Sequence, residues 1–250
     1  MIRGPRTRAA WRLLRCVLHS LHGVAIVLLR FRRLDGAQRQ RHIRWWSTKL
    51  MRLIGIEMQV EGELTAGAVL LVANHVSWLD ITALHAVVPQ ARFVSKADIR
   101  SWPLLSRLAD AADTLYLQRE RKRDALRVVH LVAQALSAGQ VVALFPEGTT
   151  SDGRALLPFH ANLLQAAIAT ATPVQPVALR FSDATAPISA AVEFVGATTL
   201  AESLWRVACA ERLVLHLALL PARPTARADR RALAQTLSDD IAARIERAAA

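Results

Sequence analysis

The chain has 250 residues, of which 53% are hydrophobic, and a formal net charge of +12. This length favours one α/β domain with terminal additions, and the basic, apolar composition favours an anionic partner such as a membrane surface or a phosphorylated substrate. Only 5% of the residues are aromatic, and no basic stripe is interleaved with aromatic residues, which argues against nucleic acid as a partner.

Residues 1–55 predict a basic, amphipathic segment of two helices that associates with a membrane. The first helix, expected over residues 13–31, is interrupted by Arg15, His19 and His22, and its uninterrupted apolar part is shorter than the roughly 20 residues that span a bilayer. A helix that lies in or dips into the membrane interface therefore fits better than a signal peptide. An ordinary amphipathic helix packed on the domain is the alternative.

The second helix is expected over residues 37–54, where apolar residues recur at helical spacing and Gly55 supplies a stop. Trp45 and Trp46 lie beside basic residues and resemble an interfacial anchor, because tryptophan combines an apolar body with a polar N–H. Two tryptophans packed in the core are the alternative interpretation.

Residues 56–225 alternate short β-like runs with helical stretches, which predicts a mostly parallel α/β sheet flanked by helices. The expected strands cover residues 56–60, 69–73, 92–95, 114–117, 141–145, 174–181 and 192–195, with 213–220 as a late strand. The expected helices lie near residues 78–87, 103–111, 121–138 and 160–170. Residues 226–250 predict a C-terminal amphipathic helix, because apolar residues recur there at i, i+4 spacing.

The stretch 74–80 combines a histidine and a carboxylate where a buried strand ends and a helix begins. Such a turn lies at the mouth of a cleft in α/β proteins. A continuous helix would separate side chains five positions apart by about 140°, so an oriented base requires His75 in the turn and Asp80 in the first helical turn. Alternatively, Ser77 and Asp80 match a capping-box-like pattern, and Asn74 suits an ordinary turn.

A second unusual turn follows the expected strand 141–145. Its sequence, Pro-Glu-Gly-Thr-Thr-Ser-Asp-Gly, contains a glycine that permits close backbone approach and three successive hydroxyl residues. Exposed amides of such a turn can hold an oxyanion or a phosphate, although an ordinary Pro/Gly turn explains the same residues. Arg119, just after the expected strand 114–117, suits bidentate contact with phosphate. Alternatively, Arg119 belongs to the start of a solvated basic helix.

Together these segments resemble the glycerolipid acyltransferase family typified by lysophosphatidic acid acyltransferases. NHVSWLD at 74–80 resembles the NHxxxxD block of the family, and TLYLQR at 114–119 resembles its second block. FPEGTTS at 145–151 is similar to the third block, and TPVQPVAL at 172–179 is similar to the fourth. The four blocks occur in the order of the family over roughly residues 56–200.

The resemblance implies a role for each block. His75 would be the general base that takes a proton from the acceptor hydroxyl, and Asp80 would hold the ring and balance its charge. This suits the chemistry, because an alcohol is a poor nucleophile at neutral pH and a positioned imidazole can activate it. The third block would bind the glycerol-phosphate part of the acceptor, and the arginine of the second block its phosphate. The expected substrate-binding residues are Asn74, Ser77, Arg119, Glu147, Gly148, Thr149 and Thr150.

The third block departs from the family at position 150, where Thr150 replaces the usual arginine. This change removes a cation expected near the phosphate, which Arg119, Lys96 or Arg154 would have to replace. Lysophosphatidate remains the first candidate acceptor. Because of this change, another lysolipid such as lyso-ornithine lipid is the second candidate.

The expected function is O-acyl transfer from acyl-CoA or acyl-carrier protein to a lysophospholipid, by direct attack and without a metal or other cofactor. A non-catalytic membrane-surface protein that binds anionic lipid is the alternative, but such a protein needs neither the histidine–aspartate pair nor the FPEG turn. Cys16 and Cys209 show no metal-ligand spacing and favour a reduced setting. We therefore expect the catalytic domain on the cytoplasmic side of the inner membrane.

Overall fold

The computed structural model describes residues 5–96, 103–117 and 122–249. Its strands are β1 (Ile56–Glu61), β2 (Val69–Ala73), β3 (Arg92–Lys96), β4 (Leu115–Leu117), β5 (Val141–Leu144), β6 (Val174–Ser182) and β7 (Leu213–Leu219). Its α-helices are α1 (Pro5–Arg30), α2 (Gly36–Ile54), α3 (Leu79–Val87), α4 (Pro103–Ala111), α5 (Lys122–Ser137), α6 (Gln165–Ala169), α7 (Leu200–Cys209) and α8 (Arg230–Ala249). Short 3-10 helices are η1 (Phe31–Arg33), η3 (Ala161–Leu164) and η4 (Ala190–Val192).

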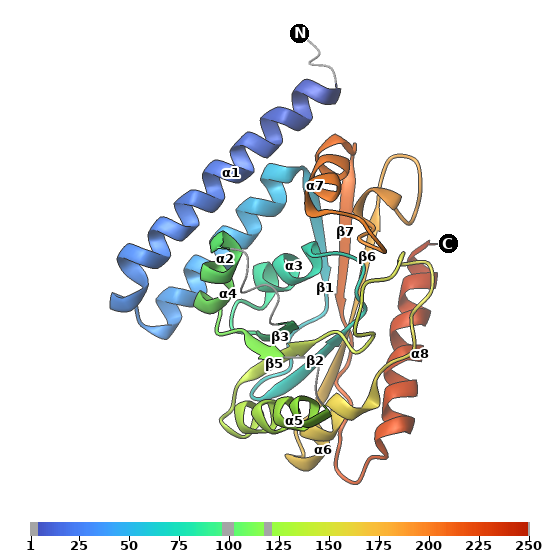
Figure 1. Ribbon diagram of the computed structural model, residues 1–250. Helices are drawn as coiled ribbons and strands as arrows, with labels where there is room; N and C mark the ends of the chain where they lie inside the picture. The colour runs from blue at the N-terminus through green and yellow to red at the C-terminus, as the bar shows by residue number, and fades with distance from the viewer. Residues whose placement is uncertain (1–4, 97–102, 118–121, 250) are drawn as a thin grey trace.

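One seven-stranded sheet in the order β1-β7-β6-β2-β5-β3-β4 forms the centre of the described structure (Figure 1). All neighbouring strands pair in parallel except β6 and β7, which pair antiparallel. Strands β1 and β7 therefore run opposite to the other strands. The mostly parallel α/β sheet predicted from the sequence is confirmed.

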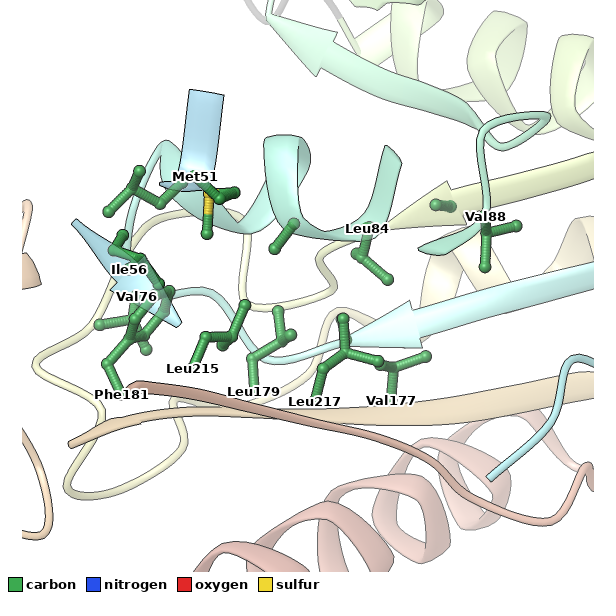
Figure 2. Packing of buried hydrophobic residues seen from close by; sticks show 14 of the residues in the cluster. Met51, Ile56, Val76, Leu84, Val88, Val177, Leu179, Phe181, Leu215 and Leu217 are labelled. Atoms are coloured by element: carbon green, nitrogen blue, oxygen red, sulfur yellow. The ribbon is translucent and has the colours of Figure 1, made fainter. Parts of the chain in front are cut away.

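The sheet is buried on both faces, as β2 shows at its centre. Val69, Leu71 and Ala73 belong to a core cluster with residues of α2, α3 and α7, whereas Leu70 and Val72 belong to a second cluster with residues of α5, α6 and α8. A central strand covered on both faces has the continuous apolar sequence found here. Figure 2 shows part of the first cluster, in which α3 packs over side chains of β6 and β7.

The region after β6 differs from the sequence prediction. The predicted strand at 192–195 is wrong, because η4 and a loop occupy this part of the chain. Val192 is buried without joining a strand, and Phe194 N donates to Val76 O at 3.2 Å instead of to a sheet neighbour. Helix α7 was not predicted, although Thr199 and Glu202 form a capping box at its start. The predicted helix at 160–170 is divided into η3 and α6.

The predicted N-terminal pair of helices is present, and it packs against the rest of the domain. Arg12 donates from Nη1 to the carbonyl oxygens of Ala208 and Ala210, each at 2.9 Å. Between the two helices, Trp46 Nε1 donates to His19 O at 3.3 Å, and His19 Nε2 lies 3.0 Å from Trp46 O. Trp46 thus packs inside the helix pair, while its neighbour Trp45 stays 38% exposed.

The other side of α1 exposes apolar side chains. Leu18, Leu28 and Leu29 are 58%, 56% and 74% exposed. By length and composition alone, the 28 residues Arg6–Arg33 could cross a membrane, with a mean hydropathy of 1.5 and 17% of the apolar window buried. Helix α1 therefore combines one face packed on the domain with one apolar face open to its surroundings.

Candidate active site

His75 lies in the turn between β2 and α3, and Asp80 lies in the first turn of α3. Nδ1 of His75 lies 2.8 Å from Oδ2 of Asp80. A carboxylate only accepts hydrogen bonds, so Nδ1 carries the proton and Nε2 is left as the basic nitrogen. This is the arrangement that an oriented base requires at a spacing of five residues.

The Asp80 carboxylate also fixes the backbone of the turn. Its Oδ2 accepts from the backbone N–H of Val76 at 2.8 Å and from that of Ser77 at 2.9 Å. The carboxylate is fully buried, so these hydrogen bonds offset part of the cost of removing its charge from water. The capping-box expectation is wrong for Ser77, because its buried hydroxyl makes no hydrogen bond among the described residues. A single side chain, Asp80, therefore serves both the helix start and the histidine.

Aromatic stacking limits rotation of the His75 ring. The ring stacks on Phe145, with the two centroids 4.0 Å apart and the planes inclined by 12°. Phe145 in turn stacks on Phe93 at 5.9 Å. The His75 side chain remains 18% exposed, so the imidazole is held on one face and stays accessible to a substrate.

The FPEG turn holds the backbone of His75 from the other side. Glu147 is 3% exposed, and its Oε1 accepts from His75 N at 2.7 Å while its Oε2 accepts from Leu157 N at 2.9 Å. Ser151 N donates to His75 O at 2.8 Å. Burial raises the pKa of Glu147, and the two backbone hydrogen bonds oppose that rise. The Glu147 carboxylate thus connects the two segments around the base.

We expect Glu147→Gln to lower kcat by about tenfold or more and to change KM for the acceptor little. An amide offers one oxygen in place of two, so one backbone N–H loses its partner, and small displacements of a catalytic group can cost up to about 10²-fold. Steady-state kinetics over a range of acceptor concentrations separates the two constants. If Glu147 instead binds substrate, as the sequence suggested, KM rises and kcat stays. The exposed residue Glu57 on β1 provides a matched control as Glu57→Gln.

The other predicted substrate-binding residues occupy different environments. Asn74 is fully buried, and its amide group exchanges two hydrogen bonds with the backbone of Leu179, at 2.9 and 2.8 Å. Gly148 has a φ of 72°, a left-handed value that suits glycine, and Thr149 is exposed beside it. Arg119 lies outside the described residues, so its predicted phosphate contact stays a prediction.

Thr150 is tied to the loop after η4, because its hydroxyl donates to Phe194 O. Arg154, a cation that could have replaced the missing arginine, lies between two acids. Its guanidinium is 3.7 Å from Glu193 and 3.9 Å from Asp152. Arg154 therefore has two acidic neighbours, although its side chain is 59% exposed.

An apolar cavity of about 530 Å³ opens between the N-terminal helices and the sheet, and it extends to residues that flank the site. Its lining includes Trp78, Phe93 and Phe194, together with apolar residues of α1, α2 and α4. His85 also lines it, and burial lowers the pKa of this histidine to about 4, so its ring is neutral near pH 7. This cavity could not be predicted from the sequence, because its wall is formed by segments far apart in the chain.

Comparison with known proteins places the chain in a family. Residues 55–180 match the family model described as Acyltransferase. The chain is 39% identical over 228 residues to a lyso-ornithine lipid O-acyltransferase of Pseudomonas aeruginosa, covering 90% of this chain and 87% of the relative. The chain belongs to the acyltransferase family. The resemblance seen in the four sequence blocks is confirmed, and membership favours an enzyme over a non-catalytic lipid-binding protein.

Two further relatives agree with this assignment. The chain is 37% identical over 191 residues to a 1-acyl-sn-glycerol-3-phosphate acyltransferase of Neisseria meningitidis, covering 76% of this chain and 74% of the relative. The crystal structure of the 1-acyl-sn-glycerophosphate acyltransferase PlsC of Thermotoga maritima aligns with a TM-score of 0.68 at 19% identity. The alignment covers 94% of this chain and 97% of that chain, so the two share a fold.

Proposed function

We propose that this acyltransferase moves a fatty acyl group from acyl-CoA or acyl-carrier protein to the free hydroxyl of a lysolipid. The observation that carries the proposal is the His75–Asp80 pair, with Nδ1 held at 2.8 Å and Nε2 left as the basic nitrogen. The exposed apolar face of α1 supports association with a membrane. We propose that this is the inner membrane, with the catalytic domain on its cytoplasmic side.

In the proposed mechanism, Nε2 of His75 takes the proton of the acceptor hydroxyl as its oxygen attacks the thioester carbonyl. The buried Asp80 carboxylate stabilises the imidazolium that forms. The attack forms the new C–O bond of a tetrahedral adduct. Collapse of this adduct restores the carbonyl, breaks the C–S bond and transfers the proton from His75 to the leaving thiolate. The transfer is direct, so no acyl-enzyme is formed. General-base catalysis of this kind contributes about 10²–10⁴-fold.

The apolar cavity is suited to an acyl chain. Its wall reaches Trp78 and Phe194, which lie next to the turn that carries His75. Each methylene removed from water there would contribute about 0.8 kcal/mol to binding. An acyl chain bound in this cavity would place the end that carries its thioester or hydroxyl group toward His75.

For the acceptor, the observations favour lyso-ornithine lipid over lysophosphatidate, which reverses the order suggested by the sequence. A phosphate needs cations, but position 150 is a threonine, and Arg154 lies near two acids. Arg119 lies outside the described residues, so only positions 150 and 154 bear on this preference. An ornithine headgroup instead presents an ammonium and a carboxylate. The Pseudomonas relative is named for lyso-ornithine lipid, and the Neisseria relative keeps lysophosphatidate as the second candidate.

An acceptor panel with the wild type and Thr150→Arg tests this proposal. We expect the wild type to acylate lyso-ornithine lipid with the higher kcat/KM, and Thr150→Arg to raise kcat/KM for lysophosphatidate about tenfold. A new hydrogen bond to a charged group is worth about 1.5–3 kcal/mol, which is sufficient for such a gain. The transfer of label from a radiolabelled acyl donor into product gives kcat/KM for each acceptor.

Thr150→Val is the matched control, because it removes the hydroxyl that donates to Phe194 O without adding a cation. A wild type that transfers acyl groups to neither acceptor would refute the proposed function. A wild type that prefers lysophosphatidate would restore that lipid as the acceptor and leave the mechanism intact.

A further inference from the structure

A groove with basic residues lies between the second half of α1 and the first half of α2, away from His75 and the FPEG turn. It shares Ile26, His42 and Trp45 with the apolar cavity. It encloses about 730 Å³, and none of its lining residues belongs to the catalytic pair or to the FPEG turn. Arginine and histidine side chains from both helices meet in its wall. The lining residues are His22, Ala25, Ile26, Leu29, Arg30, Leu34, Gln38, Arg41, His42 and Trp45.

No acidic residue is among the described residues that line this groove. Arg30 and Arg41 are exposed, and neither takes part in an ion pair among the described residues. Asp35 is the only acidic residue in the first 55 positions of the sequence. Its carboxylate accepts from Gln38 N at 2.8 Å in the capping box of α2, and among the described residues it forms no ion pair with Arg30 or Arg41. The groove therefore favours an anion.

The groove also has an apolar side, which distinguishes a lipid from a small soluble anion. Ile26 and Leu29 line it, and Leu29 is 74% exposed. The Trp45 ring contributes an amphipathic surface, with Lys49 Nζ 5.1 Å from its centroid. Tryptophan and exposed leucine beside arginine are the combination found where a helix meets the headgroup level of a membrane.

We propose that this groove binds the phosphate-bearing headgroup of an anionic membrane lipid. Arg30 and Arg41 would contact the phosphate, Trp45 would lie at the headgroup boundary, and the acyl chains would continue along Ile26 and Leu29. Such a site would seat the two N-terminal helices at one depth and one rotation on the membrane. It differs from the acceptor site, since its ligand is bound and not acylated.

Binding of the full-length protein to vesicles tests the proposal without any turnover. Vesicles of phosphatidylcholine, with and without phosphatidylglycerol, are the probes, and co-sedimentation gives the affinity. We expect Arg41→Gln and Arg30→Gln each to weaken binding to the phosphatidylglycerol vesicles about fivefold, as expected for one basic side chain near an anionic surface, and the double variant to show the product. Binding to pure phosphatidylcholine should change little.

The matched control is Arg32→Gln, since Arg32 is exposed, follows Arg30 by two residues and does not line the groove. A specific site predicts a smaller effect for this control than for either groove variant. Equal losses in all three single variants would show diffuse attraction to the surface and overturn the proposal. Competition by millimolar glycerol phosphate in place of lipid would also overturn it, because the site would then hold a soluble anion. Activity toward detergent-dispersed acceptor should be the same in all variants, which verifies folding.

Discussion

The Asp80→Asn variant should lose about 10²–10⁴-fold in kcat while remaining folded. Asparagine can keep an oxygen where Oδ2 accepts from Val76 N and Ser77 N, so the turn can survive. The amide has no charge to stabilise an imidazolium. Oδ2 is also the atom that faces His75 Nδ1. An asparagine that turned its NH₂ to the ring would place the proton on Nε2 and remove the basic nitrogen of His75, at the cost of both backbone hydrogen bonds. The kcat of purified protein, compared with that of the wild type, measures the loss.

Asparagine is a sharper test than alanine at this position, because alanine would leave two backbone N–H groups and the ring without their acceptor. The exposed residue Asp239 on α8 supplies the control Asp239→Asn, which should keep full activity. Thermal unfolding should show that Asp80→Asn still melts cooperatively. A folded Asp80→Asn protein with nearly wild-type kcat would show that the carboxylate serves only the helix start.

The sheet was largely predictable because its strands have a clear pattern. Strand β2 is apolar at every position, as a strand covered on both faces must be, and the predicted and observed bounds agree at 69–73. The direction of β7 could not be predicted in this way. Periodicity reports which face of a strand is buried, whereas direction depends on pairing with β1 and β6, which lie far away in the sequence.

The errors between β6 and β7 have a local cause. Val192 and Val195 favour a strand by residue type, but Val192 is buried by side-chain packing alone. Among the described residues, no neighbouring strand pairs with this segment. The sequence Thr-x-x-Glu at 199–202 is the signal that predicts the start of α7.

The candidate site was predictable in its residue types but not in its connections. The spacing of His75 and Asp80 implied the turn geometry that the structure has. Glu147 was assigned to substrate because it belongs to a polar turn, yet its carboxylate accepts from His75 N across 72 positions of sequence. A carboxylate suits both roles, and only the folded backbone shows which partners it reaches.

The adjacent tryptophans of α2 show the same limit. Successive helix residues differ by about 100° in direction, so one of a pair can pack inward while the other faces out. Trp46 bonds to the backbone of α1, and Trp45 is partly exposed. The core interpretation therefore describes Trp46, whereas the interfacial role of Trp45 stays a prediction.

The central claim is that His75 is the base for acyl transfer, and replacing it by alanine tests this most directly. Removal of Nε2 eliminates the proton acceptor, whereas Asp80 keeps its hydrogen bonds from Val76 N and Ser77 N, so the turn should persist. The exposed residue His130 on α5 gives the control His130→Ala, for which we expect wild-type activity.

The deciding measurement is kcat for acyl transfer by purified, folded His75→Ala with its preferred lysolipid acceptor. A general base contributes about 10²–10⁴-fold, so the variant should fall by at least about 10²-fold with little change in KM. Activity within a few-fold of the wild type would contradict the assignment of His75 as the base, and with it the proposed mechanism.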